Sequence, residues 1–281
     1  MNTMQAMPPA RRVALPGGGW LNVHEQPGSG PGLLLLHGFT DCAESFRLLL
    51  PQLVGCHLVI PDLRGHGASF RGRIDGLATF AEDVEVVAAA LGLTRVVLVG
   101  HSMGALIALT LAARGNLAVD ALMTVSGSLR PGGAGLQSLA AGFEALPCPL
   151  PDAHPFFETW YACDRSVPLA FIATLRASFT AMRREDLIAC LGILDTADLR
   201  RDAGAITLPS IAVFGASDPI FPLPHHRELI AELQPSRSVT LPCGHNPHWE
   251  LPGEVGEILR TLFAPVLRTR VDPTKLSGAP Q

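Results

Sequence analysis

One serine of this chain stands where a nucleophile is expected. Ser102 lies in Gly100-His101-Ser102-Met103-Gly104, directly after the apolar run Val96-Val97-Leu98-Val99. A serine hydroxyl reacts well only when a base takes its proton and donors hold the developing oxyanion. A sharp turn between a buried strand and a helix meets both needs, and its glycines keep Cβ atoms out of the crowded space. The pattern predicts a nucleophile, although a serine here could also simply cap a helix.

The base and the carboxylate that such a serine requires follow later in the chain. Asp218 and His245 each come directly after an apolar, strand-like run. Because the carboxyl ends of parallel strands meet at one edge of a sheet, the side chains can converge although they are far apart in sequence. We predict Ser102 as the nucleophile, His245 as the base and Asp218 as the carboxylate that fixes the imidazole tautomer. His248 is the rival base.

Two backbone N–H groups are expected to bind the oxyanion. One belongs to Met103, the residue after the nucleophile. The other is predicted at Phe39, in the loop His37-Gly38-Phe39-Thr40 that follows the apolar run Leu33–Leu36. Gly38 permits the tight backbone path that brings this donor close. We interpret His37 as a structural ring that holds the loop.

The elements that position these residues alternate between strand-like and helix-like segments. This alternation predicts an α/β fold with a mainly parallel central sheet and helices on both faces. Between about Ser126 and Ser210 the sequence lacks strand patterns and shows repeated helical spacing, which indicates an inserted helical cap. We therefore divide the chain into a core with a first part, 1–128, a cap, 129–205, a second core part, 206–268, and a disordered tail, 269–281.

Composition limits the classes of partner. The chain has 281 residues, of which 48% are hydrophobic and 16% charged, with a net charge of −4. This balance gives no reason to expect nucleic acid or an anionic membrane as a partner. No apolar run reaches the roughly 20 residues that span a bilayer, and no secretory signal is evident. The six cysteines are scattered without metal-binding spacing. We expect a cytoplasmic monomer or homodimer that needs no cofactor or metal.

Taken together, these motifs resemble the α/β-hydrolase-fold superfamily and its serine esterase-like branch, over about residues 12 to 265. The matching segments are His37-Gly38-Phe39, Pro61–Ser69, Gly100–Gly104, Gly215-Ala216-Ser217-Asp218 and Gly244-His245. The resemblance implies the triad Ser102, Asp218 and His245 with the donors Phe39 and Met103. It implies a structural role for Arg64 and His66 in the glycine-rich turn.

The reaction is less sharply indicated. Our main hypothesis is hydrolysis of a carboxylic ester with a small or medium apolar acyl or aryl group, a small-molecule substrate bound beneath the cap. Thioester or lactone hydrolysis, acyl transfer, and a receptor that has lost the chemistry are alternatives. The segments Gly244–His248 and His37–Phe39 also resemble the menaquinone-pathway lyase, but Ala105-Leu106-Ile107 stands where that branch usually has an arginine.

Aromatic side chains of the cap and the core are expected to shape the substrate pocket. We predict that substrate contacts Phe39, His101, Trp160, Tyr161 and Phe221. Four arginines of the cap could bind a substrate carboxylate or could form a solvated charged face. They are Arg165, Arg176, Arg183 and Arg184.

Overall fold

An eight-stranded sheet forms the centre of the molecule, in the order β1-β2-β4-β3-β5-β6-β7-β8. The computed structural model describes residues 4–147, 150–151 and 153–268, so the predicted tail, 269–281, lies outside the described residues. The first two pairings, β1 with β2 and β2 with β4, are antiparallel, and the others are parallel. The strands are β1 Ala10–Ala14, β2 Trp20–Gln26, β3 Ser29–Leu36, β4 Cys56–Pro61, β5 Val96–His101, β6 Val119–Val125, β7 Ser210–Gly215 and β8 Arg237–Leu241.

The continuous apolar runs of the sequence become strands that are buried on both faces. All six residues of β5 are buried, as are the last six of β3 beside it. Strand β5 pairs with β3 on one side, where Leu36 faces Gly100, and with β6 on the other, where His101 faces Val125. Ser102 therefore leaves the sheet at the carboxyl end of a central strand.

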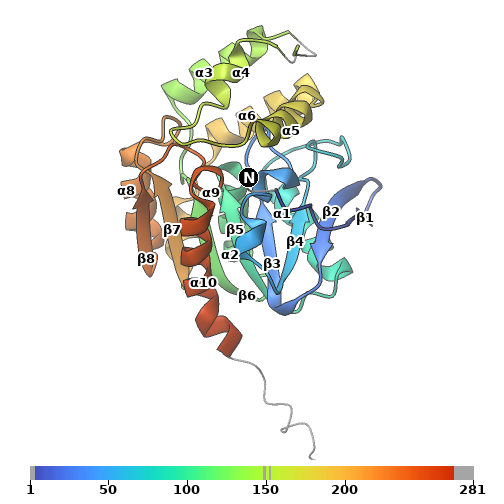
Figure 1. Ribbon diagram of the computed structural model, residues 1–281, viewed down its shortest axis with the longest axis vertical. Helices are drawn as coiled ribbons and strands as arrows, with labels where there is room; N and C mark the ends of the chain where they lie inside the picture. Colours follow the sequence, from blue (N-terminus) through green and yellow to red (C-terminus); the bar gives the residue numbers. More distant parts are fainter. Residues whose placement is uncertain (1–3, 148–149, 152, 269–281) are drawn as a thin grey trace, which may run out of the picture.

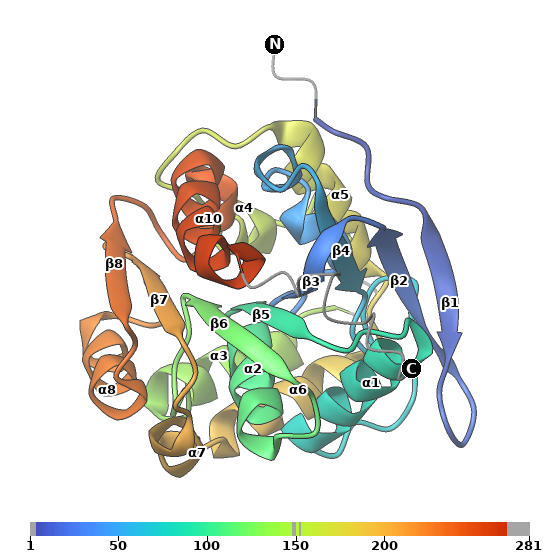
Figure 2. The same ribbon diagram turned by 90° about the horizontal axis from the view of Figure 1, so that it is seen from below.

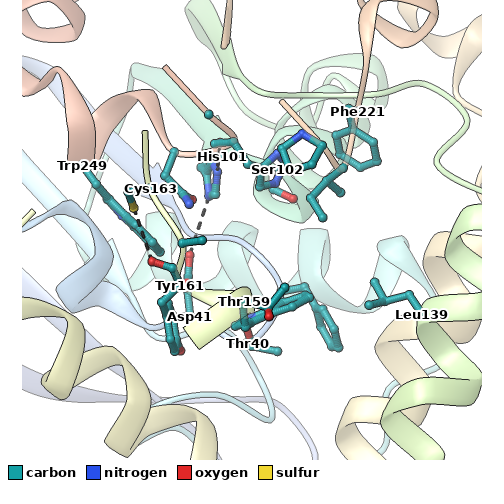
Figure 3. Close-up of a pocket in the computed structure, with 18 of the residues that line it drawn as sticks. Thr40, Asp41, His101, Ser102, Leu139, Thr159, Tyr161, Cys163, Phe221 and Trp249 are labelled. Carbon is teal, nitrogen blue, oxygen red and sulfur yellow. Dashed lines mark hydrogen bonds and ion pairs between the residues drawn. The ribbon is translucent and has the colours of Figure 1, made fainter. Parts of the chain in front are cut away.

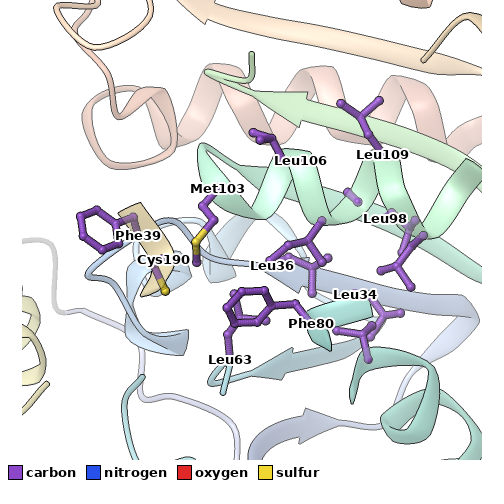
Figure 4. Packing of buried hydrophobic residues seen from close by; sticks show 14 of the residues in the cluster. Leu34, Leu36, Phe39, Leu63, Phe80, Leu98, Met103, Leu106, Leu109 and Cys190 are labelled. Atoms are coloured by element: carbon purple, nitrogen blue, oxygen red, sulfur yellow. The ribbon is translucent and has the colours of Figure 1, made fainter. Parts of the chain in front are cut away.

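Two hydrophobic layers cover the sheet, one on each face. On one side lie helices α1 (Leu77–Ala90), α2 (Met103–Arg114) and α8 (Leu223–Leu233). On the other lie α10 (Pro252–Arg268) and the two short 3₁₀ helices at Ala43–Phe46 and Leu50–Gln52 (Figure 2). In the first layer, side chains of α2 such as Met103, Leu106 and Leu109 pack over Leu34, Leu36 and Leu98 of the central strands (Figure 4). The turn that carries Ser102 is thus anchored in this buried layer.

Helices between β6 and β7 lie beyond the carboxyl edge of the sheet (Figure 1). They are α3 (Ala134–Ala145), α4 (Phe156–Trp160), α5 (Leu169–Thr180) and α6 (Arg184–Thr196). A further helix, α7 (Arg200–Ala205), falls inside the range predicted as cap but packs against α2 and α8. Of the helices that the structure describes, none has the length and apolar character needed to cross a bilayer.

Candidate active site

Ser102 occupies a strained turn between β5 and α2. Its φ of 51° and ψ of −118° lie in a region that non-glycine residues rarely adopt. The backbone holds it there, since its N–H donates to the Val125 carbonyl at 2.9 Å and its own carbonyl accepts from Ala105 N–H at 2.9 Å. A Cβ at Gly104 would collide with the carbonyl of Leu36. This is the strand–turn–helix geometry of a nucleophile elbow.

His245 and Asp218 meet at the ends of two neighbouring strands. Nδ1 of His245 lies 2.9 and 2.8 Å from the two carboxylate oxygens of Asp218. Oδ1 of Asp218 also accepts from the N–H groups of Ile220 and Phe221, at 2.8 and 2.9 Å. Burial alone would raise the pKa of Asp218, but His245 and these backbone donors outweigh it, so the pKa is lowered. An ionised Asp218 holds the proton of His245 on Nδ1, which leaves Nε2 free to act as a base.

Ser102 and His245 line the same pocket. Among the residues that the structure describes, no hydrogen bond joins the Ser102 hydroxyl to the His245 imidazole. Catalytic hydrogen bonds are often long before substrate binds and tighten in the complex. The structure therefore brings His245 and Asp218 into contact and places Ser102 and His245 in the lining of one cavity, while the complete triad stays a prediction.

The two predicted oxyanion donors border the nucleophile. Met103 is the first residue of α2, so its N–H lies at the positive end of that helix. Phe39 follows the end of β3, the strand that pairs with β5. Within the described part of the chain, neither backbone N–H donates a hydrogen bond to a protein acceptor. Neither donor is taken up by a described protein acceptor, as an oxyanion hole requires.

His37 and His66 hold backbone turns beside the site. Nδ1–H of His37 donates to the Gly38 carbonyl at 2.9 Å, and its Nε2 accepts from Leu63 N–H at 2.9 Å. Nδ1–H of His66 donates to the carbonyl of Arg64 at 2.9 Å. Burial lowers the pKa of both rings, to about 3 for His66. Both rings thus have the structural role expected of them.

His101 and His248 are buried imidazoles behind His245. Nε2–H of His101 donates to the backbone carbonyl of His245 at 3.1 Å, and its Nδ1 lies 3.7 Å from Oδ2 of Asp41. Nε2 of His248 faces the Ser45 hydroxyl at 3.1 Å instead of the pocket. Burial lowers the pKa of both rings. His101 supports the loop of the predicted base, whereas His248 is turned away from Ser102.

A cavity of about 670 Å³ opens over Ser102 between the core and the cap. In Figure 3, Ser102 and Phe221 lie on one side of it, Trp249 and Cys163 on the other, and His101 between them. A cap that closes over such a cavity excludes water from it, and a mainly apolar lining binds apolar groups. All five residues predicted to contact substrate line the cavity, namely Phe39, His101, Trp160, Tyr161 and Phe221. Further apolar lining comes from Leu136, Leu139, Phe156, Leu194, Ile220 and Trp249.

The four arginines considered for a substrate carboxylate have other contacts. None of them is among the residues that line the cavity over Ser102. Arg165 donates to the Pro242 carbonyl, and the guanidinium of Arg176 lies over the Phe157 ring. Arg183 forms an ion pair with Asp186. Arg184 donates to the carbonyls of Glu144 and Leu146.

Three residues of the site escaped sequence reasoning. Asp41 lies in the pocket wall beside His101, and Trp249 lines the pocket while its indole N–H donates to Ser45 at 3.1 Å. The buried carboxylate of Glu250 accepts from Gly244 N–H at 3.0 Å and from Arg165 N–H at 2.9 Å. Glu250 therefore joins the loop of His245 to the cap. The one local signal was a carboxylate a few positions after the predicted base.

The described residues offer no cluster for a metal ion. Among them, no group of three or more histidine, cysteine, aspartate or glutamate side chains is arranged to hold one. The chemistry available at the cavity is that of a serine hydroxyl, an imidazole paired with a carboxylate, and two free backbone donors.

The parallel sheet, the strained serine turn and the inserted helices are those of an α/β-hydrolase fold. A model of the alpha/beta hydrolase fold matches residues 31–147. Solved structures agree over nearly the whole chain. A hydrolase from Pseudomonas aeruginosa has a TM-score of 0.78 and 23% identity, covering 91% of this chain and 98% of that one. The comparisons show that the chain has the α/β-hydrolase fold over most of its length.

Relatives with curated names differ in their reactions. The chain is 36% identical over 144 residues to the magnesium-chelatase 30 kDa subunit of Rhodobacter capsulatus, covering 47% of this chain and only 48% of that protein. It is 29% identical over 253 residues to 2-succinyl-6-hydroxy-2,4-cyclohexadiene-1-carboxylate synthase of Salmonella typhimurium. That match covers 85% of this chain and 95% of the relative. An esterase from Exiguobacterium antarcticum shares the fold with a TM-score of 0.79 at 20% identity. The superposition covers 90% of this chain and 98% of that one.

Proposed function

We propose that the protein is a serine hydrolase that cleaves the carboxylic ester of a small or medium-sized, uncharged apolar acid. The observation that carries this proposal is the cavity of about 670 Å³, where Ser102 and the Asp218-paired His245 face a mainly apolar lining. A small molecule fits such a cavity, because ligand pockets commonly measure about 300–1,000 Å³.

The proposed reaction has two halves that use the same residues. Ser102 Oγ attacks the ester carbonyl while Nε2 of His245 takes the hydroxyl proton, and the N–H groups of Phe39 and Met103 hold the oxyanion. The tetrahedral intermediate collapses, and His245 gives the proton to the departing alkoxide. Water, deprotonated by His245, then attacks the acyl-enzyme, and the acid leaves as Ser102 recovers its proton. Asp218 remains ionised and stabilises the imidazolium.

The charges in the cavity favour a neutral substrate. Among the described residues that line it, there is no arginine or lysine, whereas Asp41 and Asp164 are acidic. An anionic substrate would lose its hydration without gaining a cationic partner, which is costly. The Salmonella relative is named as the synthase of a carboxylate. The lyase alternative is supported by that similarity, and the lining of this cavity argues against it.

The first test is covalent labelling combined with ester turnover. A chain-length series of p-nitrophenyl esters should be hydrolysed, and a fluorophosphonate should label the wild-type protein on Ser102. Ser102→Ala should abolish both signals. Ser236→Ala is a matched control, because its hydroxyl donates to the Ser210 carbonyl at the amino end of β7, opposite the candidate site. Wild-type protein that neither turns over any ester nor reacts with the fluorophosphonate would refute the proposal.

A second test compares two esters that differ in charge. The p-nitrophenyl ester of hexanoic acid and the mono-p-nitrophenyl ester of glutaric acid have acyl groups of similar length, but the latter ends in a carboxylate. We expect kcat/KM to be at least about tenfold higher for the neutral ester. A preference for the anionic ester would favour the lyase-like alternative. Mass spectrometry of rapidly quenched enzyme should detect the acyl group on Ser102.

A further inference from the structure

We propose that Trp160 is a positioning residue for the oxyanion hole, and that docking of the cap through its indole N–H fixes the turn that carries the Phe39 donor. The inference rests on the proposed function, because the Phe39 N–H has this role only if an oxyanion forms at Ser102. It assigns to a cap residue a part in forming the hole.

The turn that carries Phe39 has an unfavourable residue at its critical position. Asp41 N–H donates to the Gly38 carbonyl at 3.3 Å, which closes a four-residue turn with Phe39 and Thr40 at its centre. Thr40 has a φ of 65°, while Phe39 is not among the residues with positive φ. These φ signs match a type II turn, whose third position favours glycine or asparagine. A β-branched threonine is strained there, so the turn needs support from outside.

The cap supplies that support. Nε1–H of Trp160 in α4 donates to Oγ1 of Thr40 at 3.0 Å, a contact between residues 120 positions apart. Thr40 and Thr159, the residue before Trp160, both line the cavity (Figure 3). The Trp160 ring also meets the Phe39 ring edge to face, with centroids 6.3 Å apart. One side chain therefore contacts both central residues of the turn.

Phe143 of α3 packs on the same pair of rings. Its centroid lies 5.4 Å from that of Phe39 and 5.1 Å from that of Trp160. These contacts pack the rings together, but they do not involve the hydroxyl of Thr40. The hydrogen bond to Thr40 is the directional contact, since it weakens steeply when its geometry changes. It is therefore the contact that selects the strained conformation of the turn.

A relaxed turn would move the Phe39 donor. If Thr40 left its positive φ and the turn opened, the bond from Asp41 N–H to the Gly38 carbonyl would be lost, and the peptide between Gly38 and Phe39, which carries the donor, would be free to move. Oxyanion donors act within narrow limits of distance, and displacements of about 1 Å can cost 10²-fold in rate. Loss of the Trp160 bond should therefore lower kcat by about 10- to 100-fold, with KM changed less than threefold, because the turn acts on the transition state.

Five variants separate positioning from pocket shape. Trp160→Phe removes the N–H and keeps an aromatic ring, and Thr40→Val removes the acceptor and keeps the β-branched shape. Both should show the same loss in kcat, and the double variant should be no worse than either single one. Thr40→Gly also lacks the acceptor but adopts positive φ freely. It should retain most of the activity and should restore kcat in the Trp160→Phe background.

Arg130→Ala is the matched control for a lost contact between the start of the cap and the core. Arg130 Nε donates to Oε1 of Glu228 in α8 at 3.1 Å, and neither residue is among those that line the cavity. Its kcat should stay within about twofold of wild type. Kinetics with a p-nitrophenyl ester should be paired with the rate of fluorophosphonate labelling of Ser102, which needs no matched substrate. Thermal unfolding should confirm that each variant is folded.

The outcomes distinguish this inference from the proposed function. Unchanged kcat in Trp160→Phe and Thr40→Val would overturn the inference while the hydrolase stands. A rise in KM alone would also overturn it, because Trp160 would then be only a wall of the pocket. Wild-type protein without ester turnover and without fluorophosphonate labelling would overturn the proposed function and this inference with it.

Discussion

Nδ1 of His245 lies within 2.9 Å of both carboxylate oxygens of Asp218, although 27 positions separate the two residues. The side chain of Asp218 is fully buried, and the imidazole side chain of His245 is 15% exposed. The pair thus presents its one free nitrogen towards the cavity while its charged end stays in the protein. The first predictions concern this arrangement.

Asp218→Asn should lower kcat strongly with a small effect on KM. An asparagine amide can donate to Nδ1 and so favour the tautomer that carries its proton on Nε2, where it cannot act as a base. We expect a loss of about 10²- to 10³-fold in ester hydrolysis, somewhat less than for Ser102→Ala. A loss below tenfold would contradict the role assigned to Asp218.

The two neighbouring histidines should respond very differently to substitution. His245→Ala should lower kcat by about 10³-fold or more, because it removes the base. His248→Gln keeps a donor for the Ser45 hydroxyl, which Nε2 of His248 now contacts at 3.1 Å. It should lower the melting temperature and leave kcat within about tenfold of wild type. A larger kinetic effect for His248→Gln than for His245→Ala would show that the base has been wrongly assigned.

Stability should fall as the pH drops below about 6.5. Burial lowers the folded-state pKa of His37, His66, His101 and His248 from an ordinary value of 6.5. The unfolded rings bind protons below pH 6.5 and the folded rings do not, so acid favours unfolding. For His66 this loss continues to about pH 3. Urea unfolding at pH 8, 6, 5 and 4 measures the slope.

His66→Phe isolates one contribution to that slope. A phenyl ring preserves the contacts with the rings of His37 and Phe80 but cannot titrate. Its unfolding free energy should therefore depend less on pH between 6.5 and 3 than that of the wild type. The comparison matters because the raised pKa of buried Glu250 acts in the opposite direction at acid pH. Equal slopes for the two proteins would contradict the prediction.

Two glycine substitutions should have effects of opposite sign on stability. Gly104→Ala forces a Cβ against the carbonyls of Leu36 and His37, and rigid backbone cannot yield cheaply, so we expect a loss of about 3 kcal/mol. Gly192 lies in α6 with open space around its Cβ position, and alanine there should stabilise the protein by up to about 1 kcal/mol. Calorimetric unfolding compares them. Equal effects would mean that the strand–helix contact at Gly104 is not tight.

The sequence predicted the elements whose signals are local. The apolar runs became strands, and the glycines around Ser102 marked its turn, because close backbone packing demands residues without side chains. The helical spacing predicted between about Ser126 and Ser210 did not fix where each cap helix begins and ends, and α4 covers only Phe156–Trp160. The short helices α7 and α9 (Pro247–Glu250) were missed, because single turns have too few residues for a periodic signal.

Contacts between distant segments were beyond the reach of the sequence pattern. The position of Asp41 beside His101 depends on how the loop after β3 folds against β5. The pairing of Trp160 with Thr40 depends on how the cap docks. Neither contact has a spacing that could reveal it, because the partners come from different elements and meet only in the tertiary structure.

The carboxylate of Glu250 has a consequence for the size of acceptable substrates. One oxygen holds the backbone before His245, and the other holds the backbone of Arg165 in the segment that follows α4. A substrate bulky enough to displace the segment of Arg165 would also strain the hydrogen bond from Gly244 to Glu250, which holds the loop of His245. Large substrates are therefore disfavoured for two reasons. They exceed the volume of the cavity, and binding them would misalign the His245 imidazole.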